Sequence, residues 1–411
     1  MALRLSSRAQ RRQPSPIREL IPLMRRPGVI SFGGGYPNPE TFAFKALTVD
    51  LVWGQSLTLA GERLGAATQY SATEGLPALR ALLAGWHEHL TGVAPPAPPM
   101  VLTGSQEGLY LVADVLLDEG DEVIVGEPTY PGALAAFRSF TERFTAIPLD
   151  GDGMRTDLLE ALLQARVDAG ERLPALIYLI PNGDNPSGTT LSAERRAHLA
   201  ALAQRFEVPV LEDDPYLLLS LDGETRLPTI QSMAPEWVIR LDSFSKILSP
   251  GLRIGYASGP SEVMRAMTLH KQASTLQSSS FTQAILQAIF EEVGFTELEA
   301  RVGRSMAVYR RNRDAMVEAA RRLLPAEVRF TPPAAGMFLW LELPEGYLAD
   351  RMIREDLDEL PVITVPGGAF STGGGLRHCV RASFSLADQA SIEEGMRRLA
   401  AMIERERLRQ G

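Results

Sequence analysis

The sequence predicts an α/β fold in which a large domain holds a mostly parallel sheet flanked by helices, and a smaller α+β domain follows it. Between about residues 100 and 260, short apolar or β-branched segments alternate with helical patterns, as in sheets whose two faces are covered by helices. A long charged amphipathic pattern at 295–324 then predicts a helix that links two domains. Further strand patterns and a closing helical pattern come after it.

The N-terminal part of the chain is predicted to be a basic arm. Residues 1–28 contain seven arginines and one glutamate, a composition that transit peptides share, but no apolar secretory segment follows. We expect a flexible arm that becomes ordered from Pro14 onward. We assign residues 1–45 to this arm and part of the small domain, 46–295 to the large domain, and 296–411 to the small C-terminal domain.

The predicted strands are short segments rich in valine, isoleucine and leucine. In the large domain they lie at 122–126, 175–180, 208–211, 238–241 and 253–258. In the small domain, strand patterns lie at 328–343 and 363–384, and a helical pattern at 387–408. The chain has no repeat or low-complexity tract, so the prediction of the fold class rests on the alternation of these elements.

The composition narrows the classes of function. With 411 residues and 45% hydrophobic content the chain can bury a large core, and its net charge of −9 argues against binding nucleic acid. No apolar run approaches the ~20 residues that span a bilayer, so no membrane contact is expected. The single cysteine, Cys379, excludes an internal disulfide, and His87 and His89 are predicted to be solvated polar positions. We therefore expect a cytoplasmic protein without a metal site.

Chemically active side chains follow several of the predicted strands. They lie in loops 127–130, 181–188, 212–216 and 242–246, with the sequences Glu-Pro-Thr-Tyr, Pro-Asn-Gly-Asp-Asn-Pro-Ser-Gly, Glu-Asp-Asp-Pro-Tyr and Asp-Ser-Phe-Ser-Lys. Ligands of open α/β sheets bind at the carboxyl ends of the strands. The four loops are therefore expected to converge on one site.

Lys246 stands among groups that bind anions. Ser243 and Ser245 precede it at alternate positions, and Arg253 follows it seven residues later. A lysine that forms a Schiff base with pyridoxal phosphate needs the phosphate of that cofactor anchored close by, and these side chains can supply the anchor. A surface turn with a solvated lysine is the alternative that this motif alone leaves open.

Neighbouring loops contain the other groups that pyridoxal chemistry needs. Asp213 is placed to keep the pyridine nitrogen protonated, while Tyr216 and Asn185 can donate to the phenolate oxygen. A solvated acidic turn is the alternative for Asp213. Tyr130 follows a strand end, where it can stack on a planar ring or lie half-buried in the core. Ser105 begins a helical pattern, which predicts either an anion site or a simple N-cap.

The order of these motifs resembles that of fold-type I pyridoxal phosphate-dependent aminotransferases of the class I and II group. The similarity is strongest to the branch that contains kynurenine/α-aminoadipate aminotransferases and the aminotransferase-like domains of MocR regulators. It covers nearly the whole chain, through the segments PSPIREL, ISFGGGYPNPETF, ATQYSATEGLPALR, VLTGSQEGLYLVADVLLDEGDEVIVGEPTYPGAL, PNGDNPSG, LEDDPY, DSFSKILSPGLRIGY, AAGMFLW, PGGAF and VRASFS. The resemblance implies a homodimer whose large domain contains a mostly parallel seven-stranded sheet.

The resemblance also implies a role for each motif residue. Lys246 would form the Schiff base and move a proton between the substrate Cα and C4′ of the cofactor. Asp213 would pair with the ring nitrogen, and Tyr130 would stack on the ring. The phenolate oxygen would be held by Asn185 and Tyr216. The phosphate would be bound by Ser105, Gln106, Ser243, Ser245 and Arg253, together with Tyr70 from a second subunit. The substrate would be bound by Arg381, which grips its α-carboxylate, and by Asn185, Gly35, Tyr36 and Arg18.

The activity implied is transfer of an amino group from an L-amino acid of the aminoadipate, aromatic or branched-chain type to a 2-oxo acid such as 2-oxoglutarate, by a ping-pong mechanism. A ligand-sensing regulator of the MocR type is disfavoured, because the chain begins directly at the arm and is acidic. A lyase or decarboxylase that uses the same cofactor stays open, although Arg381 on the α-carboxylate argues against decarboxylation. The donor is open too, since Arg18 favours a distal carboxylate and Tyr36 an apolar side chain.

Overall fold

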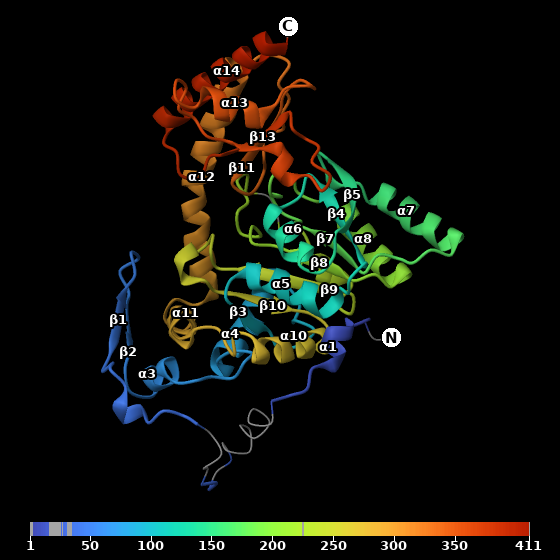
Figure 1. The fold of residues 1–411 in the computed structure, drawn as a ribbon. Coiled ribbons are helices and arrows are strands. Elements are labelled where there is room, and N and C mark those ends of the chain that lie inside the picture. The colour runs from blue at the N-terminus through green and yellow to red at the C-terminus, as the bar shows by residue number, and fades with distance from the viewer. Residues whose placement is uncertain (1–2, 16–25, 27, 31–34, 224–225, 411) are drawn as a thin grey trace.

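The computed structural model describes residues 3–15, 26, 28–30, 35–223 and 226–410. Its central feature is an eight-stranded sheet with the strand order β3-β10-β9-β8-β7-β4-β5-β6 (Figure 1). Strands β9, β8, β7, β4 and β5 are parallel, and β10 is antiparallel to both of its neighbours. The strands are β3 (Met100–Leu102), β4 (Glu122–Glu127), β5 (Arg143–Asp150), β6 (Gly153–Met154), β7 (Leu176–Leu179), β8 (Val210–Asp213), β9 (Val238–Ser243) and β10 (Gly255–Ser258).

The predicted fold class is confirmed, but the sheet has one strand more than the seven expected. The eighth strand, β6, has two residues and pairs antiparallel with the end of β5. The Asp152 amide donates to the Asp150 carboxylate at 2.9 Å in the tight turn between them. The sequence patterns do not predict β3 or β5, because β3 has only three residues and Pro148 interrupts the β5 pattern.

Helices cover both faces of the large sheet. One face, which carries Tyr178, Ile239 and Leu241, is covered by α5 (Ser105–Leu116), α6 (Pro131–Arg138) and α10 (Ser261–Ala273). The other face is covered by α4 (Pro77–Thr91), α7 (Thr156–Ala169), α8 (Ala193–Phe206) and α11 (Ser280–Val293). Short helical segments are α9 (Ile230–Met233), η1 (Pro39–Thr41), η2 (Pro250–Leu252) and η3 (Gly367–Phe370). None of the helices within the described ranges is long and apolar enough to cross a membrane.

A second, three-stranded sheet lies in the C-terminal part of the chain, at the top of Figure 1. Its antiparallel strands are β11 (Phe338–Glu342), β13 (Cys379–Ser383) and β12 (Val365–Pro366). It shares a core with α12 (Phe295–Leu323), α13 (Ala349–Asp356) and α14 (Gln389–Gln410). The linking and closing helices are confirmed. The strands are shorter than their patterns predict, because Pro332 and Pro333 precede β11 and glycines follow β12. The division into domains stays a prediction.

A β-hairpin that the sequence patterns do not predict projects beside α11, at the left of Figure 1. It consists of β1 (Leu47–Asp50) and β2 (Ser56–Leu59), and α3 (Gly61–Thr68) follows it. Leu57 and Leu59 face the core on the α11 side, whereas Val52 at the tip is 99% exposed. The hairpin therefore has one packed side and an apolar tip in solvent.

The N-terminal arm is ordered earlier than the sequence predicts. It forms α1 (Ser7–Arg11), which packs on α5 and α10. Arg12 donates to the Asp114 carboxylate of α5 at 3.0 Å. Burial raises the pKa of Asp114, but hydrogen bonds from His270 and Arg12 outweigh it and lower that pKa. The expectation that order begins at Pro14 is wrong, because the basic side chains of the arm find acidic partners on the large domain.

His87 does not lie where its sequence pattern predicts. It is fully buried on α4, with its ring edge-on to Tyr256. Burial and then the charge of Arg240 lower the pKa of His87 to about 3, so its ring is neutral. His89, on the other hand, is partly exposed and lies 2.7 Å from the Glu299 carboxylate. The prediction of a solvated position is wrong for His87, because α4 packs flat against the sheet.

A fully buried arginine holds the ends of two central strands together. Arg240 on β9 lies directly opposite Glu212 on β8. Its guanidinium donates to Asp242 from Nε and Nη2 at 2.9 Å, and from Nη2 to Asp214 at 2.9 Å. Its Nη1 lies 3.3 Å from the Glu212 carboxylate. Because all three carboxylates are buried, Arg240 neutralises charge that the core would otherwise hold unpaired.

The same network reaches the loop after β7. Asn182 donates from its side-chain amide to Asp214 at 2.8 Å, and Arg196 donates to the Asn182 side-chain oxygen at 2.6 Å. Arg196 also donates to the Pro181 carbonyl at 2.9 Å. Buried polar groups with all these partners fix one arrangement of the loops. The loops after β7, β8 and β9 are therefore tied to each other behind the carboxyl edge of the sheet.

Replacing Arg240 with methionine is expected to lower the free energy of unfolding by about 3–5 kcal/mol, because the buried carboxylates lose their counter-charge. Urea unfolding of the apoprotein measures this loss. The matched control is Arg205→Met, which removes the 2.7 Å ion pair with Glu160 on the surface. It should change the free energy of unfolding by less than about 1 kcal/mol. Equal losses in the two variants would contradict the role given to Arg240.

Candidate active site

The loops at the carboxyl edge of the large sheet meet residues of the small sheet and of α5. Arg381 of β13 donates from Nη1 to the Asn185 side-chain oxygen at 2.7 Å. The Tyr130 hydroxyl donates to the Gln106 side-chain oxygen at 3.3 Å. Burial and then the carboxylate of Asp213 raise the pKa of Tyr130. Residues that the sequence separates by up to 275 positions, from Gln106 to Arg381, thus lie in one place.

The N-terminus of α5 is open to a ligand. Its N-cap is Gly104 with φ 76°, and Ser105 is the first helical residue, so the alternative that Ser105 is the N-cap is wrong. A Cβ atom on Gly104 would lie 2.4 Å from Nη2 of Arg253, so a larger residue would displace the guanidinium. Backbone N–H groups at the start of a helix attract anions, and here no side chain caps them.

Strand β10 brings the predicted phosphate ligands together. Gly255 pairs with Ser243 across β9 and β10, and a Cβ atom on Gly255 would lie 3.3 Å from the Ser105 amide nitrogen. Arg253 donates from Nη1 to the Ser245 hydroxyl at 3.4 Å, and the Ser245 amide donates to the Ser243 hydroxyl at 3.2 Å. One cation, three hydroxyls and a helix N-terminus therefore surround a single position, which suits a phosphate group.

The chain contains three lysines, in different surroundings. Lys45 is exposed. Lys271 is fully buried, and its Nζ donates to three acceptors at 2.8, 2.9 and 2.8 Å. Lys246 is partly buried, and its amine has no hydrogen-bond partner among the described residues. Burial, then Arg253 and Arg381, lower the pKa of Lys246. Because an amine attacks an aldehyde in its unprotonated form, Lys246 is the lysine suited to a Schiff base.

Asp213 is buried beside this lysine-bearing loop and has an unused oxygen. Its Oδ2 accepts from the Tyr178 hydroxyl at 3.2 Å, whereas Oδ1 is buried without a hydrogen-bond partner in the described part of the chain. Burial raises the pKa of Asp213 to about 7, although the Tyr178 bond opposes it. The sequence reasoning missed Tyr178. Strand register offers the signal, because Tyr178 lies opposite Leu211 and so shares a sheet face with Asp213.

Arg381 is held between two aromatic rings. Its guanidinium carbon lies 4.1 Å from the Phe338 ring centroid and 5.1 Å from that of Phe370. One nitrogen is occupied by Asn185, and Nε is buried without a partner among the described residues. A guanidinium fixed in this way presents its remaining N–H groups to a carboxylate. Neither phenylalanine was singled out from the sequence. Tyr216 is also buried, edge-on to Phe338.

Three predicted substrate or cofactor residues lie apart from this cluster. Gly35, Tyr36 and Tyr70 are exposed, and the rings of the two tyrosines are 6.4 Å apart. No hydrogen bond or ring contact joins them to Lys246 within the described ranges of this chain. Arg18 lies outside the described residues. A role of Tyr70 in the site of a second subunit stays a prediction.

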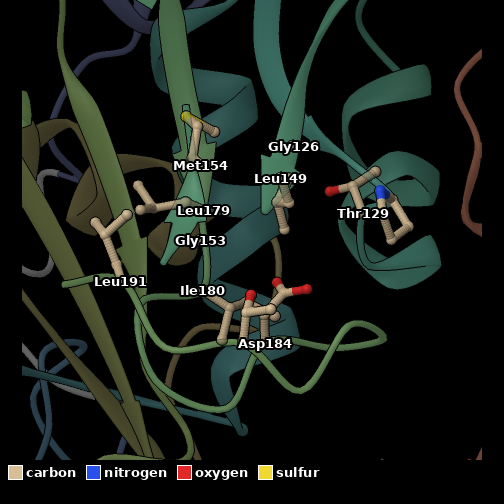
Figure 2. A pocket seen from close by; sticks show the side chains of 11 residues that line it. Gly126, Thr129, Leu149, Gly153, Met154, Leu179, Ile180, Asp184 and Leu191 are labelled. Atoms are coloured by element: carbon tan, nitrogen blue, oxygen red, sulfur yellow. The ribbon is translucent and has the colours of Figure 1, made fainter. Parts of the chain in front are cut away.

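A small pocket lies behind the loop that carries Asn185 (Figure 2). Eleven residues line it, and Asp184 is the only one with a charged side chain. Burial raises the pKa of Asp184 to about 7, although a hydrogen bond from the Ser187 hydroxyl at 2.7 Å acts to lower it. The cavity volume of about 20 Å³ has room for about one water molecule. This pocket is therefore too small for an amino acid substrate.

The donor set of the cluster fits pyridoxal phosphate. The anion position at α5 suits the phosphate, the unpaired Lys246 amine suits the aldehyde, and the unused Oδ1 of Asp213 suits the N–H of a pyridinium ring. Asn185, in the loop after β7, and Tyr216, in the loop after β8, would donate to the phenolate oxygen of such a ring. Arg381 remains free to bind a second, carboxylate-bearing molecule.

Comparisons with known proteins agree with a pyridoxal phosphate site. A family model of aminotransferase class I and II matches residues 55–399. The 2-aminoadipate transaminase of Thermus thermophilus is 40% identical over 395 residues, which cover 95% of this chain and 94% of that protein. An aromatic-amino-acid aminotransferase of Thermococcus litoralis is 35% identical over 402 residues, covering 98% and 94% of the two chains.

One similar solved structure contains a phosphopyridoxyl group. The crystal structure of an α-aminoadipate aminotransferase from Thermus thermophilus, complexed with N-(5′-phosphopyridoxyl)-L-leucine, matches with a TM-score of 0.75 at 36% identity and covers 98% of each chain. The chain therefore belongs to the class I and II aminotransferases, and it is a pyridoxal phosphate-dependent enzyme of that family.

Proposed function

We propose that the enzyme is a homodimer that transfers the amino group of an L-amino acid to 2-oxoglutarate in two half-reactions, by a ping-pong mechanism. The observation that carries the proposal is the position of Lys246 beside Arg253 and Arg381, with an amine that has no hydrogen-bond partner in the described part of the chain. Pyridoxal phosphate, when bound, supplies a carbon that accepts the amino group and a ring that withdraws electrons from the substrate Cα–H bond.

In this proposal each side chain of the cluster has one task. Arg381 binds the α-carboxylate of the substrate, and its two flanking phenylalanines keep the guanidinium in place. With pyridoxal phosphate bound, the Lys246 amine would take the proton from the substrate Cα. Asp213 keeps the pyridine nitrogen protonated, and Tyr130 stacks on the ring. Because Arg381 orients the substrate by its carboxylate, the Cα–H bond faces Lys246 and the carboxylate is retained.

The donor is proposed to be of the aminoadipate, aromatic or branched-chain type. Support comes from the relatives, whose names refer to 2-aminoadipate and aromatic amino acids, and from the leucine adduct in the solved structure. Within this chain, Tyr36 supplies an apolar surface at 40% exposure, which suits aromatic or branched side chains. Arg18 supplies a cation for a distal carboxylate, which suits aminoadipate.

The proposed dimer places the exposed aromatic residues of one subunit at the site of the other. Tyr70 is 51% exposed, and Phe44, which precedes the β1–β2 hairpin, is 55% exposed. The apolar tip of the β1–β2 hairpin is exposed too. Large apolar side chains left in solvent on one side of a subunit support an interface there.

Lys246→Ala is expected to abolish turnover and the absorbance of the lysine-bound cofactor, because no other lysine has a free amine near the site. The assay measures glutamate formed from an amino acid and 2-oxoglutarate. Lys45→Ala is the control and should keep full activity. Full activity in Lys246→Ala would refute the assignment. Release of ammonia or carbon dioxide by the wild type, without glutamate, would favour the lyase or decarboxylase alternative.

A panel of amino donors separates the roles of the two arginines. Arg381→Met is expected to lower kcat/KM at least tenfold or so for every donor, because each donor loses a charge-assisted pair of hydrogen bonds. Arg18→Ala is expected to lower kcat/KM only for donors with a distal carboxylate. If Arg18→Ala affects leucine and aminoadipate equally, the proposed salt bridge to the distal carboxylate is wrong.

Asp213→Asn is expected to stabilise the apoprotein in a pH-dependent way. The pKa of Asp213 is raised from 3.8 to about 7. The contribution of Asp213 to wild-type stability is therefore greatest below pH 4 and decreases as the pH rises to 7, whereas the asparagine of the variant does not titrate. Their difference should grow from near zero at pH 4 to roughly 4 kcal/mol above pH 7. Urea unfolding of both apoproteins across this range measures it, and a pH-independent difference would contradict the prediction.

A further inference from the structure

Lys271 on α10 is the one fully buried lysine of the chain, and the mechanism above does not use it. Its Nζ donates to the Val101 carbonyl at 2.8 Å, to the Glu107 carboxylate at 2.9 Å and to the Ser278 hydroxyl at 2.8 Å. An ammonium group has three N–H donors, so all of them are engaged. Lys271 is therefore fixed in one position and does not reach a ligand itself.

Its partners surround the turn between β3 and α5. Glu107, in the first turn of α5, accepts from the Thr103 amide at 2.5 Å. The Ser278 hydroxyl lies 3.2 Å from the Thr103 hydroxyl. The amine also holds the carbonyl of Val101, two residues before the turn. Lys271 thus connects, directly or through one neighbour, to both sides of Thr103.

This turn forms one wall of the phosphate position. The Thr103 carbonyl accepts from Nη2 of Arg253 at 3.3 Å, and Gly104 and Ser105 follow in the chain. Gly104 has no room for a side chain against Arg253. A shift of Thr103 would therefore move both the arginine and the first N–H groups of α5.

The negative charge of Glu107 must be neutralised if an anion is to bind at the N-terminus of α5. A carboxylate in the first turn of a helix lies close to any anion that the helix N-terminus binds, and two like charges at this range repel each other. The ion pair with Lys271 at 2.9 Å cancels the charge of Glu107. The carboxylate can then hold the Thr103 amide without weakening the anion position.

We propose that Lys271 is a positioning residue for the cofactor phosphate, acting through Glu107 and the turn at Thr103. It neutralises the carboxylate beneath the phosphate position and holds the turn that presents Arg253 and the N-terminus of α5. The inference rests on the proposed phosphate-binding role of Arg253 and Ser105. It assigns to Lys271 no contact with the cofactor.

The test compares two ligands that differ only in the phosphate group, pyridoxal phosphate and pyridoxal, on the full-length apoprotein. Lys271→Gln keeps hydrogen-bonding capacity but leaves Glu107 uncompensated. It should raise the Kd of pyridoxal phosphate about tenfold or more, and that of pyridoxal by less than about threefold. In Lys271→Gln/Glu107→Gln the repelling charge is gone, so most of the phosphate-specific loss should be recovered.

Equal losses for both ligands, or no recovery in the double variant, would overturn the inference. Arg253→Gln tests the site on which it rests. If Arg253→Gln leaves the ratio of the two Kd values unchanged, the phosphate position itself is misassigned. If Arg253→Gln changes this ratio and Lys271→Gln does not, only the role of Lys271 is refuted. If Lys271→Gln does not fold, the same two Kd values are measured for Ser278→Ala, because this variant removes one hydrogen-bond acceptor of the Lys271 amine. A loss confined to pyridoxal phosphate supports the inference, and any other result overturns it.

Discussion

The guanidinium of Arg240 holds three buried carboxylates at the carboxyl ends of β8 and β9, and the loops of Asp213 and Lys246 extend from those ends. Successive residues of a strand point to opposite faces, so Asp214 turns toward Arg240 while Asp213 turns toward Tyr178. The neighbouring carboxylates Asp213 and Asp214 therefore have different partners on opposite faces of the sheet. Since Arg240 balances only part of the negative charge behind the sheet, the cluster also contributes to the raised pKa of Asp213.

Close backbone approach is the second constraint on the site. Gly104 lies against the Arg253 guanidinium, and Gly255 lies against the Asp242 carbonyl and the Ser105 amide. At both positions a side chain would separate segments that must touch. The anion position is therefore assembled from the start of α5 and from the continuous segment 243–255, which are distant in sequence. The ion pair of the buried Lys271 and the partly buried Glu107 lies directly behind it.

The substrate side of the site joins the two sheets. Arg381 belongs to the small sheet, yet its guanidinium donates to Asn185 in a loop of the large sheet. The flanking rings of Phe338 and Phe370 both come from the C-terminal part of the chain. A carboxylate bound by Arg381 would therefore contact both parts of the protein at once. This geometry links binding of the substrate to the relative placement of the two sheets.

The fold class, the long linking helix and the ordered set of motifs could be predicted from the sequence, because strand and helix periods and loop motifs are local properties of the chain. Those motifs also singled out Lys246, Asp213 and Arg253, whose roles stay predictions. The burial of His87, the hydrogen bond from Tyr178 to Asp213 and the two phenylalanine rings beside Arg381 could not be predicted in this way. Each of these depends on strand register or on helix packing between distant segments, and the pattern of a single segment contains no information about its partner.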